Sequence, residues 1–289
     1  MKIGKLAVIG LGLIGGSLAR AARAANAAGS ISGYDTDARQ RRLAVELGVV
    51  DSAPDTAVAA VREAEVVVLA VPVLHTGEAL KACHAALSAG TIVTDVGSTK
   101  QSVLADVQAV LGTTPPWFVA AHPIAGTEKS GVANSSPELF KGHRVIVTPH
   151  ARQDGAALAR VADLWTAVGA RVVTMDPAQH DAIFAATSHL PHVLAYSFVD
   201  MLARLDARDE IFPNAGGGFR DFTRIASSSP EMWHDIVRAN AVTVAQLLEK
   251  QVGQLTEVLA MIRQGRWDDL KRLFERAREA RERHLSQIE

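Results

Sequence analysis

The stretch K-L-A-V-I-G-L-G-L-I-G at residues 5–15 decides the fold of this chain. Residues 5–10 form an apolar run typical of a buried strand, and the Ala-rich residues 14–28 are typical of a helix. Between them, residues 10–15 fit the pattern G-x-G-x-x-G. A glycine turn that follows a strand and opens a helix presents free N–H groups to an anion. The stretch therefore predicts the phosphate-binding turn of a dinucleotide-binding fold.

Each glycine of the turn has its own expected task. Gly10 permits the tight turn, Gly12 lets the backbone approach a pyrophosphate, and Gly15 lets the helix pack on the strand. Further cofactor contacts are expected in the same turn and at the end of a later strand, at Leu13, Ile14, Val71 and Pro72.

Asp35 indicates which dinucleotide is bound. It lies 20 residues beyond Gly15, at the end of a second predicted strand over 30–35, where a carboxylate accepts hydrogen bonds from an adenosine ribose. The alternative is an ordinary aspartate of a surface turn. A 2′-phosphate would be repelled by this carboxylate, so NAD is favoured over NADP. Three nearby arginines could offset that repulsion: Arg39, Arg41 and Arg42.

Short apolar strands alternate with helices as far as about residue 174. Further strands are predicted at 65–71, 91–95, 117–121, 144–148 and near 171–174. Helices are predicted at 37–47, 75–88, 99–111 and 154–168. This alternation indicates a mostly parallel sheet covered on both faces. Residues 1–174 are therefore predicted to form an α/β domain of the Rossmann type.

The pattern changes after about Met175, where strand signals disappear. Helices are predicted over 178–205, 230–264 and 266–286, with a loop at 212–219. The first of these is apolar nearly all round, which suits burial between helices. Residues 175–289 are therefore predicted to form an all-α domain.

Composition excludes several classes of protein. The 289 residues carry 30 Lys and Arg against 31 Asp and Glu, a net charge of -1, so a general binder of nucleic-acid backbones is not expected. Cys83 is the single cysteine, which excludes an intramolecular disulfide and a Cys-based zinc site. We interpret it as a packing residue.

The amino terminus has two interpretations. Lys2 and Lys5 before the apolar residues 6–14 resemble a short signal peptide. Four glycines inside the supposed apolar core are poor for such a helix and favour the strand and turn. We see no apolar run of 18 residues elsewhere, so no membrane span and a cytoplasmic protein are expected.

A second group of polar residues follows two predicted strands, in D-V-G-S-T-K at 95–100 and A-H-P-I-A-G-T-E-K-S-G at 121–131. Ser98 could cap the next helix, with Gln101 completing a capping box. His122, held extended by the following proline, could be structural. The carboxyl ends of strands line the ligand crevice of this fold, so both residues are also candidates for catalysis.

Three motifs give the chain a family resemblance. H-P-I-A-G-T-E-K-S-G at 122–131, S-H-L-P-H at 188–192 and G-G-G-F-R-D-F-T-R-I-A at 216–226 resemble the prephenate/arogenate dehydrogenases of tyrosine biosynthesis. The resemblance covers almost the whole chain, with the motifs in the family's order. It implies an NAD(P)-binding Rossmann domain, a helical domain that dimerises, and a small-molecule substrate. That substrate is prephenate, oxidised and decarboxylated to 4-hydroxyphenylpyruvate, or arogenate, and no residue decides between them.

The resemblance also implies roles for individual residues. His122 hydrogen-bonds the hydroxyl at C4 of the substrate ring, and Ser98 supports it. Arg224 binds a substrate carboxylate, and His192 contacts the substrate side chain. Other family positions around the pocket are Thr127, His189, Gly217 and Trp233. One alternative is that Trp233 reaches across the dimer.

The residue chemistry agrees with these roles. A neutral imidazole accepts the hydroxyl hydrogen bond, and a planar guanidinium binds a carboxylate bidentately. Arg220 lies four residues from Arg224, on the same face if helical, so either could pair with a carboxylate of the protein. His189 and His192 could bind a metal, but without a third ligand none is expected.

Purely structural roles for some of these residues, and two other functions for the chain, stay open. His180 is predicted on a helix surface, and Trp233 could be a core residue. A β-hydroxyacid dehydrogenase would need a catalytic lysine in the helical half, where we find no convincing candidate. A dinucleotide-sensing protein would keep the glycine turn and lose the second cluster, which this chain retains in Ser98, His122 and Arg224.

Overall fold

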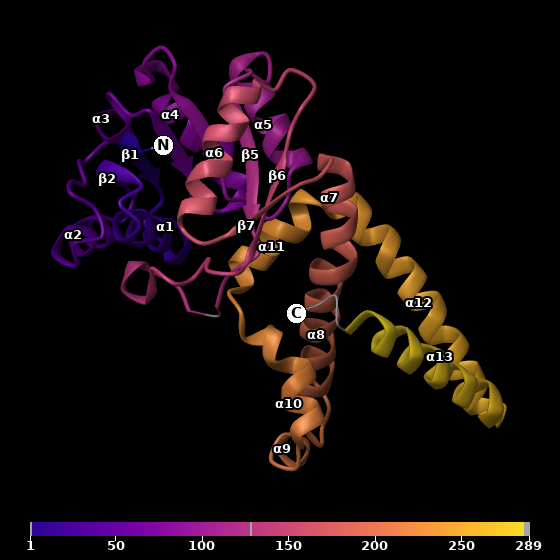
Figure 1. The fold of residues 1–289 in the computed structure, drawn as a ribbon. Helices are drawn as coiled ribbons and strands as arrows, with labels where there is room; N and C mark the ends of the chain where they lie inside the picture. Colours follow the sequence, from indigo (N-terminus) through magenta and orange to yellow (C-terminus); the bar gives the residue numbers. More distant parts are fainter. Residues whose placement is uncertain (1, 128, 286–289) are drawn as a thin grey trace. The chain divides into compact units, whose positions relative to one another are not determined.

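Seven strands form one sheet in the order β2-β1-β3-β4-β5-β6-β7. Figure 1 labels β1, β2, β5, β6 and β7 among the helices of this half of the chain. The computed structural model describes residues 2–127 and 129–285. All seven predicted strands are present, at β1 (Ile3–Ile9), β2 (Ala28–Tyr34), β3 (Val66–Leu69), β4 (Ile92–Asp95), β5 (Phe118–Pro123), β6 (Arg144–Thr148) and β7 (Arg171–Thr174). The predicted mostly parallel sheet is confirmed, since only the β5–β6 pairing is antiparallel among the described strands.

Helices cover both faces of the sheet, and the alternation of side chains along the strands explains why. In β1, Val8 belongs to a core cluster that includes Leu18 and Trp165, whereas Ile9 belongs to a second cluster that includes Leu80. The first face is covered by α1 (Leu13–Ala24) and α6 (Gly155–Ala167), and the second by α3 (Ala57–Val61), α4 (Thr76–Cys83) and α5 (Gln101–Leu111). The remaining helix of this half is α2 (Ala38–Glu46).

The order in which strands are added to the sheet reverses at β1, because β2 lies on one side of it and β3 on the other. In open α/β sheets this switch point opens a crevice at the carboxyl ends of the strands, where ligands bind. Gly10 follows β1 and Ala70 follows β3 at this edge. The topology therefore places the glycine turn at the expected ligand crevice.

No strand follows β7 in the described residues, and the chain continues as helices. They are α7 (Pro177–Phe184), a π-helical turn (Ala185–His189), α8 (Leu190–Ala203), α9 (Arg208–Ile211), α10 (Gly217–Thr223), a 3₁₀ turn (Arg224–Ser227), α11 (Pro230–Ala239), α12 (Ala241–Arg263) and α13 (Trp267–Leu285). Two predictions were wrong here. The predicted loop at 212–219 contains the start of α10, and the predicted helix 230–264 is broken at Asn240.

Two compact units divide the chain after Ala241, one over Met1–Ala241 and the other over Val242–Glu289. The first helices after β7 thus belong to the unit that holds the sheet. The division near residue 174 marks where strands end, and as a domain boundary it stays a prediction.

The expectation that no segment could span a membrane is not met by the helical run Pro177–Ala203. It is 27 residues long and its most apolar 18-residue window has a mean hydropathy of 1.2, enough to cross a membrane by length and composition alone. Only 22% of that window is buried inside the chain. His180, Asp181 and His189 interrupt the apolar residues, which is why the sequence showed no continuous apolar run. These three side chains are among the buried ones.

Candidate active site

The glycine turn has the open backbone that a pyrophosphate requires. Gly10 has φ +98°, in the left-handed region, and a Cβ there would lie 2.2 Å from the Ala70 carbonyl oxygen. A Cβ on Gly15 would lie 2.0 Å from the Gly10 carbonyl oxygen. A Cβ on Gly12, which caps α1, would meet nothing within 4 Å. The turn is thus packed against β3 on one side and open at Gly12, so its residues fit a phosphate-bearing cofactor.

Asp35 is anchored to the same turn. Its Oδ2 accepts a hydrogen bond from the Leu11 N–H at 2.8 Å, and its Oδ1 accepts one from the Asp37 N–H at 2.9 Å. The half-buried carboxylate keeps further lone pairs for hydroxyl donors. Arg41 donates to the Asp35 carbonyl oxygen at 2.7 Å and to Asp55 at 2.9 Å. Of the three nearby arginines, Arg41 is therefore held at the end of β2 by an acidic partner.

A chain of three hydrogen-bonded side chains lies at the carboxyl end of β5. His122 Nδ1 is 2.9 Å from His180 Nε2, and His180 Nδ1 is 2.8 Å from Asp181 Oδ1. His180 is completely buried, so its prediction as a helix-surface residue was wrong. The Phe184 ring lies 5.0 Å from that of His122 and 4.5 Å from that of His180. Helix α7 thus supplies the partners of the candidate catalytic histidine.

Sequence reasoning missed His180 and Asp181 as members of the site. Their one visible signal is a charged and titratable pair, H-D at 180–181, inside an otherwise apolar helix. Polar residues at such positions are usually paired when they are buried. The pairing itself depends on how α7 docks, because His180 is 58 residues from His122.

Burial dominates the electrostatics of these histidines. It holds the pKa of His122 well below the ordinary value, helped by neighbouring His180, Lys100 and His189. Burial also lowers the pKa of His180, although the hydrogen bond to Asp181 opposes the shift. It lowers the pKa of His189 to about 4. All three imidazoles are therefore neutral at neutral pH.

Beneath His122, a buried ion pair joins β4 to β5. Lys100 Nζ donates to Asp95 Oδ2 at 2.5 Å and to the Ala121 carbonyl oxygen at 2.6 Å. The other Asp95 oxygen accepts from the Ala121 N–H at 3.0 Å. Burial lowers the pKa of Lys100, while the charge of Asp95 opposes that shift. The pair fixes the backbone residue that precedes His122.

The predicted capping box at Ser98 was wrong. Helix α5 begins at Gln101 with Lys100 at the N-cap position, and no side chain of that position caps it. Instead Asp181 accepts from the Lys100 N–H at 2.7 Å and from the Gln101 N–H at 2.9 Å. Ser98 is half-buried in the loop that precedes these two residues. A carboxylate from a distant helix has replaced the local cap.

A second group of candidate residues lies along the π-turn, α8 and α11. The His192 ring stacks on Trp233, with centroids 3.4 Å apart and planes at 18°. His192 Nδ1 is 2.8 Å from the Ser188 carbonyl oxygen, and Asn240 Nδ2 is 3.3 Å from His189 Nδ1. The pKa of His192 is lowered by burial and also by the positive charge of Arg224. The structure therefore brings His189, His192, Trp233 and Arg224 together within one chain.

Two predicted site residues are not brought to these clusters. Thr127 and Gly217 are exposed, and no hydrogen bond or ring contact in the described ranges joins them to the histidines. Trp233, a candidate for a core residue or a cross-subunit contact, is only partly buried. Its Nε1 atom is buried without a hydrogen-bond partner among the described residues.

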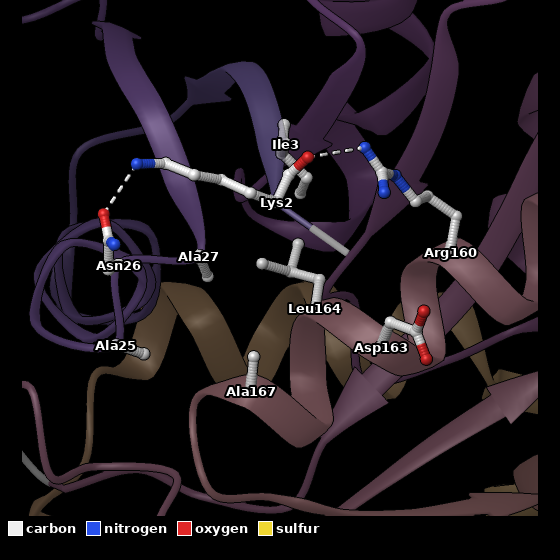
Figure 2. Close-up of a pocket in the computed structure, with 9 residues that line it drawn as sticks. All are labelled: Lys2, Ile3, Ala25, Asn26, Ala27, Arg160, Asp163, Leu164 and Ala167. Atoms are coloured by element: carbon white, nitrogen blue, oxygen red, sulfur yellow. Dashed lines mark hydrogen bonds between the residues drawn. The ribbon is translucent and has the colours of Figure 1, made fainter.

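A hollow of about 190 Å³ lies at the other end of the sheet (Figure 2). There Lys2 Nζ donates to Asn26 Oδ1 at 2.7 Å, and Arg160 donates to the Lys2 carbonyl oxygen at 3.1 Å. Lys2 precedes β1, whereas Gly10 follows it. This hollow is therefore not part of the crevice that holds the candidate site.

Fold and site together define a class of protein: an oxidoreductase with a nucleotide-binding α/β domain followed by a helical domain. Residues 18–174 match the family described as prephenate dehydrogenase, nucleotide-binding domain. Residues 176–276 match the prephenate dehydrogenase dimerization domain. The chain belongs to the prephenate dehydrogenase family, as its motifs predicted.

Individual relatives support this assignment over the full length. The chain is 38% identical over 278 residues to a cyclohexadienyl dehydrogenase of Zymomonas mobilis, covering 96% of this chain and 94% of that protein. It is 36% identical to a prephenate dehydrogenase of Bacillus subtilis, covering 94% and 74%. A crystal structure of prephenate dehydrogenase from A. aeolicus with hydroxyphenyl propionate and NAD+ superimposes with a TM-score of 0.90 at 34% identity, covering 100% and 99% of the two chains.

Proposed function

We propose that the chain catalyses the NAD-dependent oxidative decarboxylation of prephenate to 4-hydroxyphenylpyruvate. One observation carries the proposal: His122 is half-buried at the carboxyl end of β5, with its Nδ1 atom 2.9 Å from His180 Nε2. Its Nε2 has no hydrogen-bond partner among the described residues, and the lowered pKa keeps the ring neutral. A neutral imidazole nitrogen is the acceptor that a reacting hydroxyl requires.

The cofactor proposal rests on the glycine turn and on Asp35. The open space at Gly12 and the start of α1 would hold the pyrophosphate, and Asp35 would bind the adenosine ribose. A 2′-phosphate would meet the Asp35 carboxylate, while Arg41 is already paired with Asp55. When bound, NAD accepts the hydride that leaves C4 of the substrate. The relative from A. aeolicus was crystallised with NAD+.

The substrate is a dianion, and the chain would orient it with cations and histidines. Arg224 would pair with a carboxylate, and His192, close enough for the Arg224 charge to lower its pKa, would contact the side chain. As the hydride leaves, His122 Nε2 draws the hydroxyl proton and the ring carboxylate departs as carbon dioxide. Aromatisation of the ring favours the product. From the family resemblance we also place Ser98, Thr127, Gly217, His189 and Trp233 around the substrate.

A second substrate has support of its own. The relative from Zymomonas mobilis, 38% identical, is a cyclohexadienyl dehydrogenase. Arogenate differs from prephenate by an ammonium group in place of the side-chain keto group, so the chemistry at C4 is unchanged. Turnover of arogenate to tyrosine is therefore the alternative to the proposed preference.

The test is a direct assay of the purified protein. NAD is supplied with prephenate or with arogenate, NADH absorbance is followed, and the product is identified by chromatography. We expect NADH and 4-hydroxyphenylpyruvate from prephenate, with NADP a poorer oxidant. NADH only from arogenate would move the assignment to the alternative, and no NADH from either substrate would refute the proposal.

A further inference from the structure

The carboxylate of Asp181 contacts two parts of the site at once. Oδ1 is 2.8 Å from His180 Nδ1 and accepts from the Lys100 N–H at 2.7 Å. Oδ2 accepts from the Gln101 N–H at 2.9 Å. Asp181 is 1% exposed, so these protein groups take the place of water. Burial acts to raise the pKa of Asp181, but the hydrogen bonds from His180, Lys100 and Gln101 outweigh it and lower that pKa.

The direction of each hydrogen bond follows from this charge. An ionised carboxylate can only accept, so His180 must carry its proton on Nδ1. A neutral His180 then has a lone pair on Nε2, and the 2.9 Å contact requires His122 to donate from Nδ1. The lone pair of His122 is thereby left on Nε2. Without Asp181 either tautomer of the His180–His122 pair would satisfy the contact between the rings.

The opposite arrangement needs a cationic His180, and its surroundings disfavour that. His122 faces His180, Lys100 and His189, while His180 faces Asp181, Lys100 and Asp95. The carboxylate of Asp95 already binds Lys100 Nζ. A positive His180 would be buried beside the Lys100 cation.

The same carboxylate holds the start of α5. Exposed or solvated helix ends commonly take a cap from the preceding residues, but here both acceptor oxygens come from α7, 80 residues along the chain. Ser98 lies in the loop directly before the two N–H groups that Asp181 binds. Asp181 is thus connected to one candidate catalytic residue through His180 and to the other through the backbone of α5.

We propose that Asp181 is the positioning residue of the site: acting through His180, it fixes the proton of His122 on Nδ1, and it holds the α5 terminus that carries Ser98 into the crevice. The consequence for turnover rests on the proposed function. The position of the proton is a property of the free protein and can be measured without substrate.

The first measurement is made on the unaltered protein. Nitrogen NMR of the imidazole rings distinguishes a protonated from an unprotonated nitrogen, and the His122 signals are assigned by their loss in His122→Asn. We expect the His122 proton on Nδ1 at neutral pH. A proton on Nε2 would overturn the proposal before any turnover is measured.

Variants of His180 separate the hydrogen-bond chain from simple packing. His180→Leu keeps bulk but gives His122 no acceptor, so both His122 tautomers should appear and kcat should fall by about 10²-fold or more. His180→Gln offers an N–H to Asp181 and an oxygen to His122. It should restore the Nδ1 proton and recover most of kcat, while the KM for NAD stays within about twofold in both variants.

Asp181→Asn tests the carboxylate itself. Its single amide oxygen cannot face both His180 and the Gln101 N–H, so the Nδ1 proton of His122 should be partly lost and kcat lowered. Asp176→Asn is the matched control, because Asp176 caps the same helix from an exposed position and asparagine caps equally well. The control should keep both the tautomer and kcat. An Asp181→Asn protein with an unchanged His122 tautomer and unchanged kcat would overturn the proposal. The expected tautomer in a protein inactive on prephenate and arogenate would refute only the proposed function.

Discussion

At His122, burial keeps the imidazole neutral to more acidic pH than an ordinary histidine. We expect His122→Asn to lower kcat by about 10²–10⁴, because asparagine keeps a polar contact without the basicity. The acid limb of the wild-type pH profile should lie below the ordinary histidine pKa and vanish in the variant. The KM for NAD should change little. A variant that retains more than about a tenth of wild-type kcat would remove His122 from this role.

Arg224 and Arg220 are the two candidates for binding the substrate carboxylate, and each serves as the control for the other. Both are exposed, but Arg224 is the one whose charge acts on His192. We expect Arg224→Ala to raise the KM for prephenate at least about tenfold, equivalent to roughly 1.4 kcal/mol if KM follows binding. Arg220→Ala should leave that KM within about twofold, and the KM for NAD should be unchanged in both. The reverse ranking would assign the carboxylate to Arg220.

His189 makes the stability of the fold depend on pH. Its pKa is lowered to about 4 in the folded protein, so below the ordinary pKa near 6.5 the unfolded chain binds a proton that the native protein does not. The contribution of His189 to the free energy of unfolding should therefore be complete above about pH 6.5 and be lost as the pH drops toward 4. In urea unfolding, His189→Gln should reduce this slope by up to about 1.4 kcal/mol per pH unit. An unchanged slope would contradict the assignment.

At the scale of elements, two glycines of the glycine turn serve different purposes: Gly15 allows α1 to pack on β1, and Gly12 leaves space for the cofactor. A Cβ on Gly15 would lie 2.0 Å from the Gly10 carbonyl oxygen, so Gly15→Ala must push α1 away from β1. A Cβ on Gly12 meets nothing within 4 Å, and the backbone there has an ordinary φ of -80°. We expect Gly15→Ala to lower both the melting temperature and NAD affinity. Gly12→Ala should keep the melting temperature and lose NAD affinity by at least about tenfold, because the added methyl occupies the pyrophosphate space.

Both quantities can be measured on the same samples, by thermal unfolding and by titration with NAD. Full NAD affinity in Gly12→Ala would show that the pyrophosphate does not approach the turn there.

The sequence predicted the strands better than the helical half. Continuous apolar runs such as Val66–Leu69 are typical of strands buried on both faces of a parallel sheet, and every strand was found. The break at Asn240 was missed because the side chain bonds the Asp181 carbonyl oxygen and His189, partners that lie far away in the sequence. The loop predicted at 212–219 was wrong from Gly217 onward, since three glycines concealed the start of α10.

The same distinction applies to the candidate site. Gly10, Asp35 and His122 were found because each follows a strand, and strand ends share one edge of a parallel sheet. His180 and Asp181 were missed because nothing local shows which face of α7 docks on the sheet. Ser98 was wrongly predicted to cap α5 for the same reason, because the cap of that helix comes from Asp181 of α7.

For the whole molecule, exposed apolar side chains point to association. Of the 17 exposed large hydrophobic side chains in the described ranges, 13 lie between Ile183 and Phe274. The family's dimerization domain covers 176–276. Contiguous patches of exposed apolar side chains on a protein mark interaction sites. We therefore expect light scattering to give a dimer mass at micromolar concentration.

Met201 offers a direct test of that interface, because it is 50% exposed on α8. Met201→Glu should shift the mass toward the monomer, whereas Val58→Glu, on the α/β half, should not. A monomer mass for the unaltered protein would contradict the expected homodimer.

The docking of α7 on the sheet has a consequence for how the protein becomes active during synthesis. His122 meets His180 across 58 residues, and Gln101 meets Asp181 across 80. Contacts between such distant parts of a chain close large loops, and they tend to form late in folding. All seven strands and the glycine turn leave the ribosome before α7 does. We therefore expect the nascent chain to acquire a dinucleotide site first and an oriented catalytic histidine last.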